Sequence, residues 1–383
     1  MSMPEIVSQL PALDTLPGLL LLMTAFSGEF PATMVSRLPG ADTYKEFAVK
    51  RLKRDKLIRS FYRDGLRGLR LTSAAKKMLL TSYPDWFQSA LTGNTETNFL
   101  KSEITRRLRL HRMAEVLVLM NNIGISIFPW EKPAIFQATP IPTEFCFGQP
   151  AYYSSREVKE IGPQSSKIRG SRATGILLTD GGIFVVYNTA ATEMKWEYKA
   201  EMRLKALLQI ELCQQRLPTK FRNAPQDAIV FGSSMKPMEW LMGIESKATR
   251  SFFVLDGNFE HFYYLTNDHH GEVLLQLLCE PELKSSLDEI LMENLSESRA
   301  GWPIVNDGFD ESEAPVLFGY TCDMPRIKHF DTALSLHNQT GTLICFDFQE
   351  ETMRRICGPR VSLQCIDFNA VERSVLHIPE EPD

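Results

Sequence analysis

The chain has 383 residues, of which 44% are hydrophobic and 23% are charged, and its formal net charge is −5. This length exceeds what one ordinary hydrophobic core organises, so two or three domains are expected, and the composition excludes a disordered chain. The seven cysteines form no CxxC pair and mostly lie in apolar runs, which predicts reduced core thiols in a cytoplasmic protein.

The first strongly apolar run is LPGLLLLMTAF, residues 16–26. It is too short to span a bilayer, and Glu5 and Asp14 precede it without any Lys or Arg, so it fits neither a membrane span nor a signal peptide. We expect a buried helix over 14–27, capped by Asp14, and then a short second helix over 31–38.

A third helix is expected to run from Thr43 to about Leu57. Thr43 followed by Glu46 fits a capping box. At about 100° per residue, Ala48 and Leu52 share one face, while most of the Lys and Arg side chains point away from it. Cations on the outward face of two successive turns suit a helix that lies against phosphates and base edges in a major groove.

A basic β-hairpin is expected next. Residues 57–63 have strand composition, residues 64–68 (DGLRG) supply a turn, and residues 69–72 form the returning strand. Another helix begins near Ser73. Three helices, a hairpin and a closing helix predict a winged helix-turn-helix domain over residues 1–95, with a hairpin tip that reaches a phosphate backbone or a minor groove.

The positive charge of the chain is concentrated in this domain. Residues 45–77 contain twelve Lys or Arg and three acids, an excess of +9. This concentration favours double-stranded DNA as the partner, ahead of a merely solvated basic face, an RNA ligand or a protein-docking module. The residues expected to contact DNA are Thr43, Tyr44, Lys45, Phe47, Lys50, Arg51, Arg54, Arg59, Arg63, Arg67 and Arg70.

The middle of the chain is expected to connect this domain to the next. Residues 96–122 change from basic to apolar, which predicts one helix that leaves the basic domain and enters the following core, with His111 on its surface. Residues 123–171 contain several prolines and little periodicity, which predicts an irregular but packed connection.

Strand and helix patterns alternate over the remainder. Two strands are expected over 172–188 around the turn at Asp180, followed by a long amphipathic helix over 196–217. We therefore expect an α/β domain over 172–300, further strand–helix units over 301–383, and an α/β class for the chain overall.

One set of residues suggests an enzyme. Asp180, Glu193 and Lys195 have the D…ExK order of metal-dependent nucleases of the restriction-endonuclease type, in which two acids hold Mg²⁺ and a lysine stabilises the attacking hydroxide. However, Asp180 and Glu193 are expected beyond opposite ends of one strand, on the order of 20 Å apart. We therefore expect no catalytic site, no metal site and no cofactor, with a metal-dependent nuclease as the alternative.

Three stretches of the chain are similar to the replication-relaxation family of plasmid and conjugative-element proteins. They are LKRDKLIRSFYRDGLRGLRLTSAAKKML, RLRLHRMAEVLVLMNNIG, and SRATGILLTDGGIFVVYNT continued by MKWEYKAEMRLKALL. The third stretch resembles the strand–strand–helix of a nuclease-like core. Family members often carry an acid where this chain has Asn188, which implies a degenerate core without activity.

The resemblance implies a bacterial accessory protein that binds DNA of a mobile element for replication, relaxation or mobilisation, or for the regulation of these processes. Relaxase or replication proteins would be further partners. Two alternatives stay open from the residues themselves: a homodimer that reads two half-sites, and a winged-helix scaffold that docks proteins.

Overall fold

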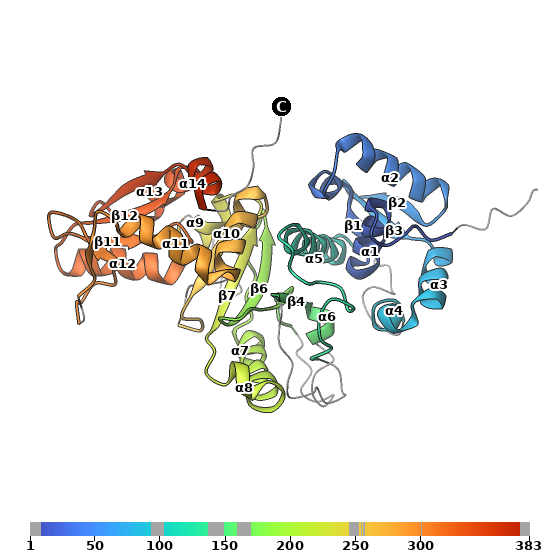
Figure 1. Ribbon diagram of the computed structural model, residues 1–383, viewed down its shortest axis with the longest axis horizontal. Helices are drawn as coiled ribbons and strands as arrows, with labels where there is room; N and C mark the ends of the chain where they lie inside the picture. Colours follow the sequence, from blue (N-terminus) through green and yellow to red (C-terminus); the bar gives the residue numbers. More distant parts are fainter. Residues whose placement is uncertain are drawn as a thin grey trace, which may run out of the picture. The chain divides into compact units, whose positions relative to one another are not determined.

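The structure is a computed structural model, and it describes residues 9–92, 103–136, 149–158, 170–244, 253, 255, 257–299 and 301–375. The chain forms two compact units, which we describe separately: unit 1 is Met1–Ala134 and unit 2 is Ile135–Asp383 (Figure 1). Both helices and sheets are present, so the predicted α/β class is confirmed. Among the residues described, no helix has the length and apolarity of a membrane span.

Unit 1 combines helices with a three-stranded antiparallel sheet of order β1-β3-β2. Its elements in chain order are α1 (Leu16–Ser27), β1 (Phe30–Pro31), the 3₁₀ helix η1 (Ala32–Arg37), α2 (Asp42–Arg54), β2 (Ile58–Arg63), β3 (Leu66–Leu71), α3 (Ser73–Ser82), α4 (Pro84–Leu91) and α5 (Ile104–Asn122).

The hairpin between β2 and β3 follows from its turn residues. Asp64 and Gly65 both have positive φ, of 53° and 73°, and they join strands that pair from Ile58 opposite Leu71 to Arg63 opposite Leu66. An Asp-Gly dipeptide tolerates positive φ at both positions. The backbone twist of such a turn matches the twist of the flanking strands.

Several helix ends differ from those expected. Thr15, not Asp14, caps α1 by accepting a hydrogen bond from the Gly18 amide. The second helix is a six-residue 3₁₀ segment. The carbonyl of Ala41 accepts the first bonds of α2, so Ala41 is the cap, and the capping box at Thr43 is wrong because Thr43 lies inside the first turn.

The helix expected to connect two domains is instead a core helix of unit 1. α5 is buried along most of its length, including Leu110, Ala114 and Val118, and it contacts α1 and β1. A run of apolar residues at helical spacing marks a buried helix, but it does not say which core buries it.

Unit 2 contains two five-stranded sheets, of orders β4-β5-β6-β7-β8 and β13-β12-β11-β10-β9. The elements of its first half are β4 (Ala151–Ser154), α6 (Ser155–Val158), β5 (Gly175–Leu178), β6 (Ile183–Ala190), α7 (Tyr198–Leu207), the π-helix η3 (Leu208–Arg216), α8 (Pro218–Phe221), β7 (Gln226–Gly232), α9 (Lys236–Leu241) and β8 (Phe262–Thr266). Those of its second half are α10 (His269–Cys279), α11 (Pro281–Met292), β9 (Ser296–Glu297), β10 (Gly308–Phe309), β11 (Pro315–Phe318), α12 (Met324–Leu336), β12 (Gly341–Phe346), η4 (Asp347–Gln349), α13 (Glu350–Ile356), β13 (Val361–Ile366) and α14 (Phe368–Val375).

Each sheet is part antiparallel and part parallel. In the first sheet β4, β5 and β6 pair antiparallel, and β6, β7 and β8 pair parallel. In the second, β11, β12 and β13 are parallel, with β10 and β9 antiparallel at the other side. Parallel neighbours need a crossover between them, and the helical segments between successive parallel strands supply it.

The segment 123–171 is not simply an irregular connection. Residues 151–154 form β4, which pairs with β5 and buries Tyr152 and Tyr153. Residues 137–148 and 159–169, which belong to the same expected connection, lie outside the described residues.

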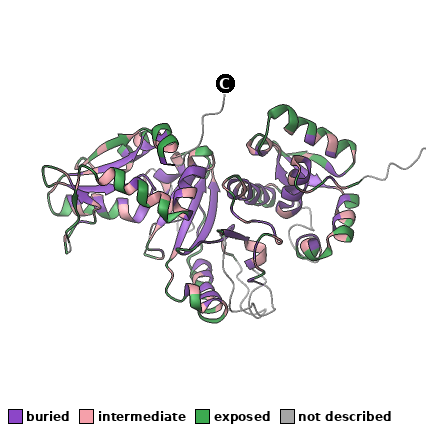
Figure 2. Cartoon of the chain, in the orientation of Figure 1, coloured by how far each residue is buried: buried purple, intermediate pink, exposed green. Residues whose placement is uncertain are grey.

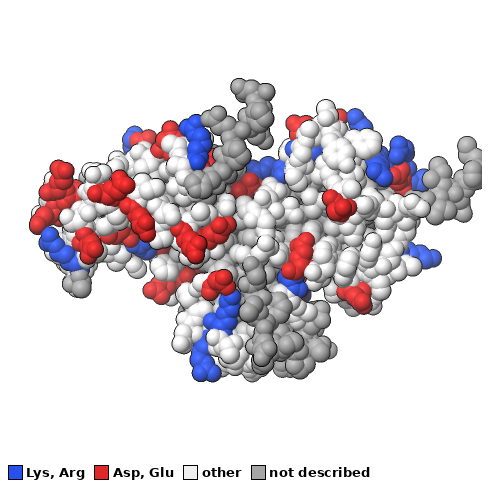
Figure 3. Space-filling view, viewed as in Figure 1, with Lys and Arg blue, Asp and Glu red and all other residues white. Residues whose placement is uncertain are grey.

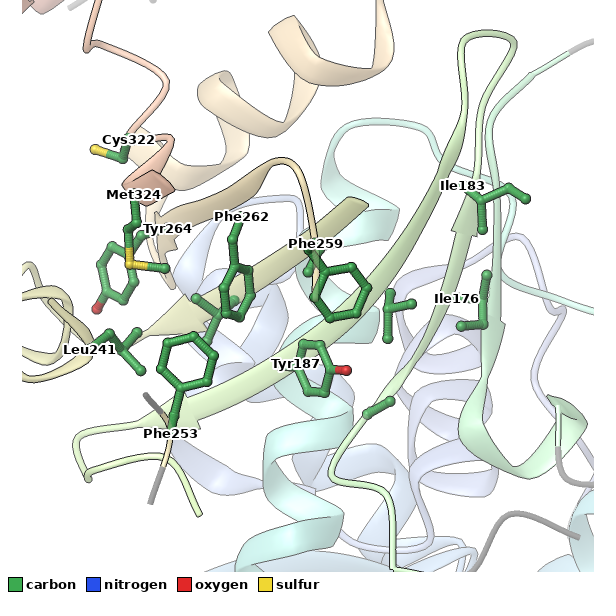
Figure 4. Packing of buried hydrophobic residues seen from close by; sticks show 14 of the residues in the cluster. Ile176, Ile183, Tyr187, Leu241, Phe253, Phe259, Phe262, Tyr264, Cys322 and Met324 are labelled. Carbon is green, nitrogen blue, oxygen red and sulfur yellow. The ribbon is translucent and has the colours of Figure 1, made fainter. Parts of the chain in front are cut away.

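One hydrophobic core serves both sheets of unit 2. Figure 4 shows Tyr187 of β6, Phe262 of β8 and Met324 of α12 in one cluster. The same cluster contains Leu317 and Leu343 from the second sheet. The ranges 172–300 and 301–383, expected as separate parts, therefore share their core.

We predict that truncating Leu343, which is fully buried, loosens both sheets. Leu343→Ala should cost about 2–5 kcal/mol because it leaves a cavity in the shared core. Hydrogen exchange of the full chain should show faster exchange in β6 as well as in β12. Leu336→Ala, at an exposed leucine of α12, is the matched control. Loosening confined to β11–β13 would contradict a shared core.

Candidate nucleic-acid interface

Helix α2 presents a basic and aromatic surface. Ala48 and Leu52 are buried on its inner side, and Figure 2 shows much of the helix exposed on the other side. Of the residues expected to contact DNA on this helix, Lys45 and Arg51 are partly buried, whereas the exposed ones are Thr43, Tyr44, Phe47, Lys50 and Arg54.

The exposed cations of α2 form only weak local ion pairs. Lys50 lies 3.0 Å from Glu46, and Arg54 lies 3.1 Å from Asp55. Exposed pairs of this kind contribute about 0–1 kcal/mol, so a phosphate can replace the carboxylate at little cost. Lys45 is more constrained, because its Nζ donates to the Ser36 carbonyl at 2.7 Å as well as to Asp42.

The hairpin adds exposed arginines beside α2. Arg59, Arg63 and Arg67 are exposed, and Arg67 lies over the ring of Tyr62 with 6.0 Å between the guanidinium carbon and the ring centroid. Burial lowers the pKa of the Lys76 side chain, and the positive charges of the neighbouring Arg59 and Arg70 lower it further.

Arg70 is not part of the exposed surface, and its expected role as a DNA contact does not fit the structure. It is 2% exposed, and its Nε donates to Glu29 Oε2 at 2.8 Å. The reason is that both faces of β3 are covered in its second half. Leu69 and Leu71 are buried on one face, and Arg70 on the other face contacts the buried carboxylate of Glu29.

Glu29 is the centre of a buried ionic cluster. Arg107 of α5 donates to Glu29 Oε1 from Nη2 at 2.6 Å, and Arg70 Nη2 lies 2.6 Å from Oε2. His111 Nε2 lies 2.9 Å from Oε1, and it must carry a proton there because an ionised carboxylate only accepts. Burial alone would raise the pKa of Glu29, but the hydrogen bonds from His111, Arg107 and Arg70 outweigh it and lower the pKa to about 2.

The cluster also fixes the tip of the hairpin. Arg107 donates from Nη1 to the Arg63 carbonyl and from Nη2 to the Leu66 carbonyl, each at 2.8 Å. Gly68 of β3 lies against Glu29, and a Cβ at this position would be 2.1 Å from Glu29 Oε1. A single buried arginine on α5 therefore ties the exposed hairpin to the core of unit 1.

Sequence reasoning missed this cluster. His111 was expected on a surface, and Arg107 was counted among the cations of a basic helix start, but both are buried. A weak signal existed, since Arg107 and His111 are four residues apart and so share one face of a helix with Leu110 and Ala114. Nothing local to Glu29, which follows Gly28 at the end of α1, identified it as their partner.

The surface of unit 1 keeps its positive excess without Arg70. Residues 45–77 then retain eleven Lys or Arg against three acids. On the face drawn in Figure 3, Lys and Arg side chains are visible over α2 together with some Asp and Glu, and several Asp and Glu side chains are visible over the second half of unit 2.

The nuclease candidates are not brought together. Asp180 lies in the turn before β6 and pairs with Lys220, whereas Glu193 and Lys195 follow the other end of β6. The eight residues of β6 span roughly 26 Å, far beyond the reach of one shared ion. No group of three or more metal-ligating side chains occurs among the residues that the structure covers.

Unit 2 contains two buried acids, Asp227 and Asp323, that contact a half-buried histidine, His261, and the sequence did not reveal this group. His261 Nδ1 lies 2.7 Å from Asp323 Oδ2, and Asp227 accepts from the His261 amide at 3.3 Å. Burial, with some help from Asp323 and Glu260, raises the pKa of Asp227 to about 6 although His261 opposes the shift. The hydrogen bond to Asp323 raises the pKa of His261. These bonds join β7 and the residue before β8 to the residue before α12.

Another buried carboxylate of unit 2, Glu201 of α7, was also not expected. It accepts from Tyr187 Oη at 2.9 Å, from Ser171 Oγ at 2.9 Å and from the Arg172 amide at 2.7 Å. Burial raises its pKa in spite of these bonds. The Glu201 carboxylate thus joins α7 to β6 and to the segment before β5.

Comparison of the chain with protein-family models, with characterised proteins and with solved structures gave no match.

We predict that acid weakens unit 1 through Glu29. Its pKa is about 2 in the folded chain against 4.5 when unperturbed, so its contribution is complete above pH 4.5 and is lost as the pH falls towards 2. The loss between pH 5 and pH 2 is roughly 3 kcal/mol. Hydrogen exchange of β3 amides measures it. Glu46→Gln, at an exposed pair, should leave the loss unchanged, and Glu29→Gln should abolish it. An equal loss in Glu29→Gln would contradict the assignment.

The opposite pH dependence is expected in unit 2. The folded pKa of Asp227, about 6, lies above its ordinary 3.8, so its contribution is present at pH 4 and is lost as the pH rises through 6. The raised pKa of His261 acts in the same direction. Exchange protection of β7 should fall by roughly 2 kcal/mol from pH 4 to pH 8. Asp227→Asn should reduce this change and be the more stable form at pH 8. A variant with the unaltered pH profile would refute the prediction.

Proposed function

We propose that unit 1 is a winged helix-turn-helix domain that binds double-stranded DNA. The order α1, β1, η1, α2, β2, β3 supports this, because it is a helix, a strand, a short helix, a longer helix and then a hairpin. In this arrangement α2 is the recognition helix, and the β2–β3 hairpin is the wing.

The observation that carries the proposal is the exposed basic surface of α2 and the hairpin. Lys50, Arg51 and Arg54 would face phosphates and base edges in the major groove, and Arg59, Arg63 and Arg67 would contact the backbone or the minor groove beside it. The Arg107 bonds to the hairpin carbonyls would hold the wing at a set distance from α2, so that both contacts form together.

We further propose that the whole chain is a non-catalytic accessory protein of a bacterial mobile element, acting with relaxase or replication proteins. The support is the sequence resemblance stated above. In this proposal β5, β6 and α7 are a degenerate nuclease-like core, in which Asn188 stands where an acid would be needed. The Asn188 carboxamide accepts a hydrogen bond from the Ala190 amide, a local structural role.

We predict salt-sensitive binding of duplex DNA. If the six cations named above each neutralise one phosphate, the slope of log K against log salt should be about −5, because each contact releases condensed counterions. Lys50→Ala/Arg54→Ala should weaken binding and reduce the slope by about 2. Fluorescence anisotropy across a salt series measures both quantities.

Arg354→Ala/Arg355→Ala, an exposed basic pair on α13 in unit 2, is the matched control and should bind like the parent chain. Binding without salt dependence, or equal loss in both double variants, would overturn the proposal. A stable protein complex that forms unchanged after removal of the hairpin arginines would favour the docking scaffold instead.

A further inference from the structure

Three aromatic side chains stay exposed on the basic surface of unit 1. Tyr44 and Phe47 of α2 are 43% and 46% exposed, and Tyr62 of β2 is 67% exposed. The rings of Tyr44 and Phe47 are nearly parallel, with 13° between their planes and 6.0 Å between their centroids. Exposed rings of this kind contribute little to folding, and their faces are accessible to a ligand.

Other aromatic residues of unit 1 are packed. Phe26, Phe87, Phe128, Trp86 and Trp130 form one connected group of ring contacts. These rings pack against one another, whereas the three exposed rings lie on α2 and the hairpin, the two elements that carry the cations.

The side chains of α2 can contact phosphates and guanine edges through Lys and Arg, but they are not suited to reading adenine in an intact duplex. Its sequence, DTYKEFAVKRLKR, contains no Asn or Gln, the residues that read adenine by paired hydrogen bonds. Lys and Arg neutralise phosphates, and aromatic rings stack on bases whatever their sequence. Proteins that bind unpaired nucleotides combine cations, which contact the backbone, with exposed aromatic rings, which stack on the bases.

We propose that the preferred ligand of unit 1 is DNA in which a short stretch of bases is unpaired, with Tyr44 and Phe47 stacking on those bases. This proposal rests on the proposed DNA binding. The basic residues of α2 and the hairpin hold the backbone, and the parallel pair of rings offers faces to bases that have left the helix stack. Tyr62, beside Arg67 on the hairpin, is the third ring on this surface.

The test compares a duplex with the same duplex carrying an internal bubble of mismatched bases. The parent chain should bind the bubble roughly tenfold more tightly, since stacking on one base contributes on the order of 1–3 kcal/mol. Tyr44→Leu/Phe47→Leu keeps apolar side chains but removes the rings, and should bind both DNAs with the affinity of the duplex. Tyr198→Leu, at an exposed tyrosine of α7 in unit 2, should behave like the parent chain.

A fluorescent base in the bubble reports the contact directly. 2-Aminopurine at an unpaired position should be quenched when the parent chain binds, and the quenching should be lost in Tyr44→Leu/Phe47→Leu. Because both residues are exposed, thermal unfolding of this variant should match that of the parent chain.

The outcomes separate the two proposals. Salt-sensitive binding with equal affinity for duplex and bubble, or a preference that survives in Tyr44→Leu/Phe47→Leu, would overturn the stacking inference and leave duplex binding standing. No salt-sensitive binding to either DNA would overturn the proposed function itself. Tighter binding of an RNA bubble of the same sequence would overturn the choice of DNA.

Discussion

The buried carboxylate of Glu29 is the interaction on which the arrangement of unit 1 depends. It is fully enclosed, and Arg70, Arg107 and His111 reach it from β3 and α5. An isolated buried charge would cost several kcal/mol, and this one is tolerated because two arginines and a histidine bond to it. The group joins the end of α1, the central strand and α5. Since the same Arg107 also bonds to the hairpin carbonyls, the buried ion pair adds to the strand pairing and packing that position the exposed hairpin.

This arrangement divides the cations of one basic stretch into two kinds. Arg70 stabilises the core, whereas Lys50, Arg54, Arg63 and their neighbours stay available to a ligand. The distinction matters for interpreting substitutions, because loss of Arg70 would weaken the proposed DNA binding only by disturbing the fold. The exposed cations carry weak local pairs that a phosphate can displace. The exposed, nearly parallel rings of Tyr44 and Phe47 lie on the same helix as Lys50 and Arg54, where we propose that they stack on bases.

Unit 2 shows why patterns along a chain do not define domains. Most of the longer strands over 172–300 and 301–383 were expected from the sequence, but the buried side chains of the two ranges meet in one cluster. The D…ExK order likewise shows that residues in a catalytic order along the chain need not form a site. Asp180, Glu193 and Lys195 are close in sequence, and the length of β6 keeps Asp180 away from the other two. Meanwhile Asp227, His261 and Asp323, spread over nearly a hundred residues, lie in contact. Regions 137–148 and 159–169 lie outside what the structure describes.

The sequence alone determined several of the local elements of unit 1. An Asp-Gly turn between two strand-like runs specifies the β2–β3 hairpin, and apolar residues at helical spacing specify α1, α2 and α5. The sequence also determined that the cations of α2 point outward, because Ala48 and Leu52 define the buried side of the helix and the cations lie on the opposite side. Tertiary structure decided which charges are buried. When a face of a strand or helix carries ionic residues, the sequence does not show whether that face is packed or exposed. The sequence alone predicts surface positions for Arg70, Arg107 and His111. Their partner Glu29 lies forty or more positions away in the chain, and such long-range pairing produces no periodic pattern in the sequence.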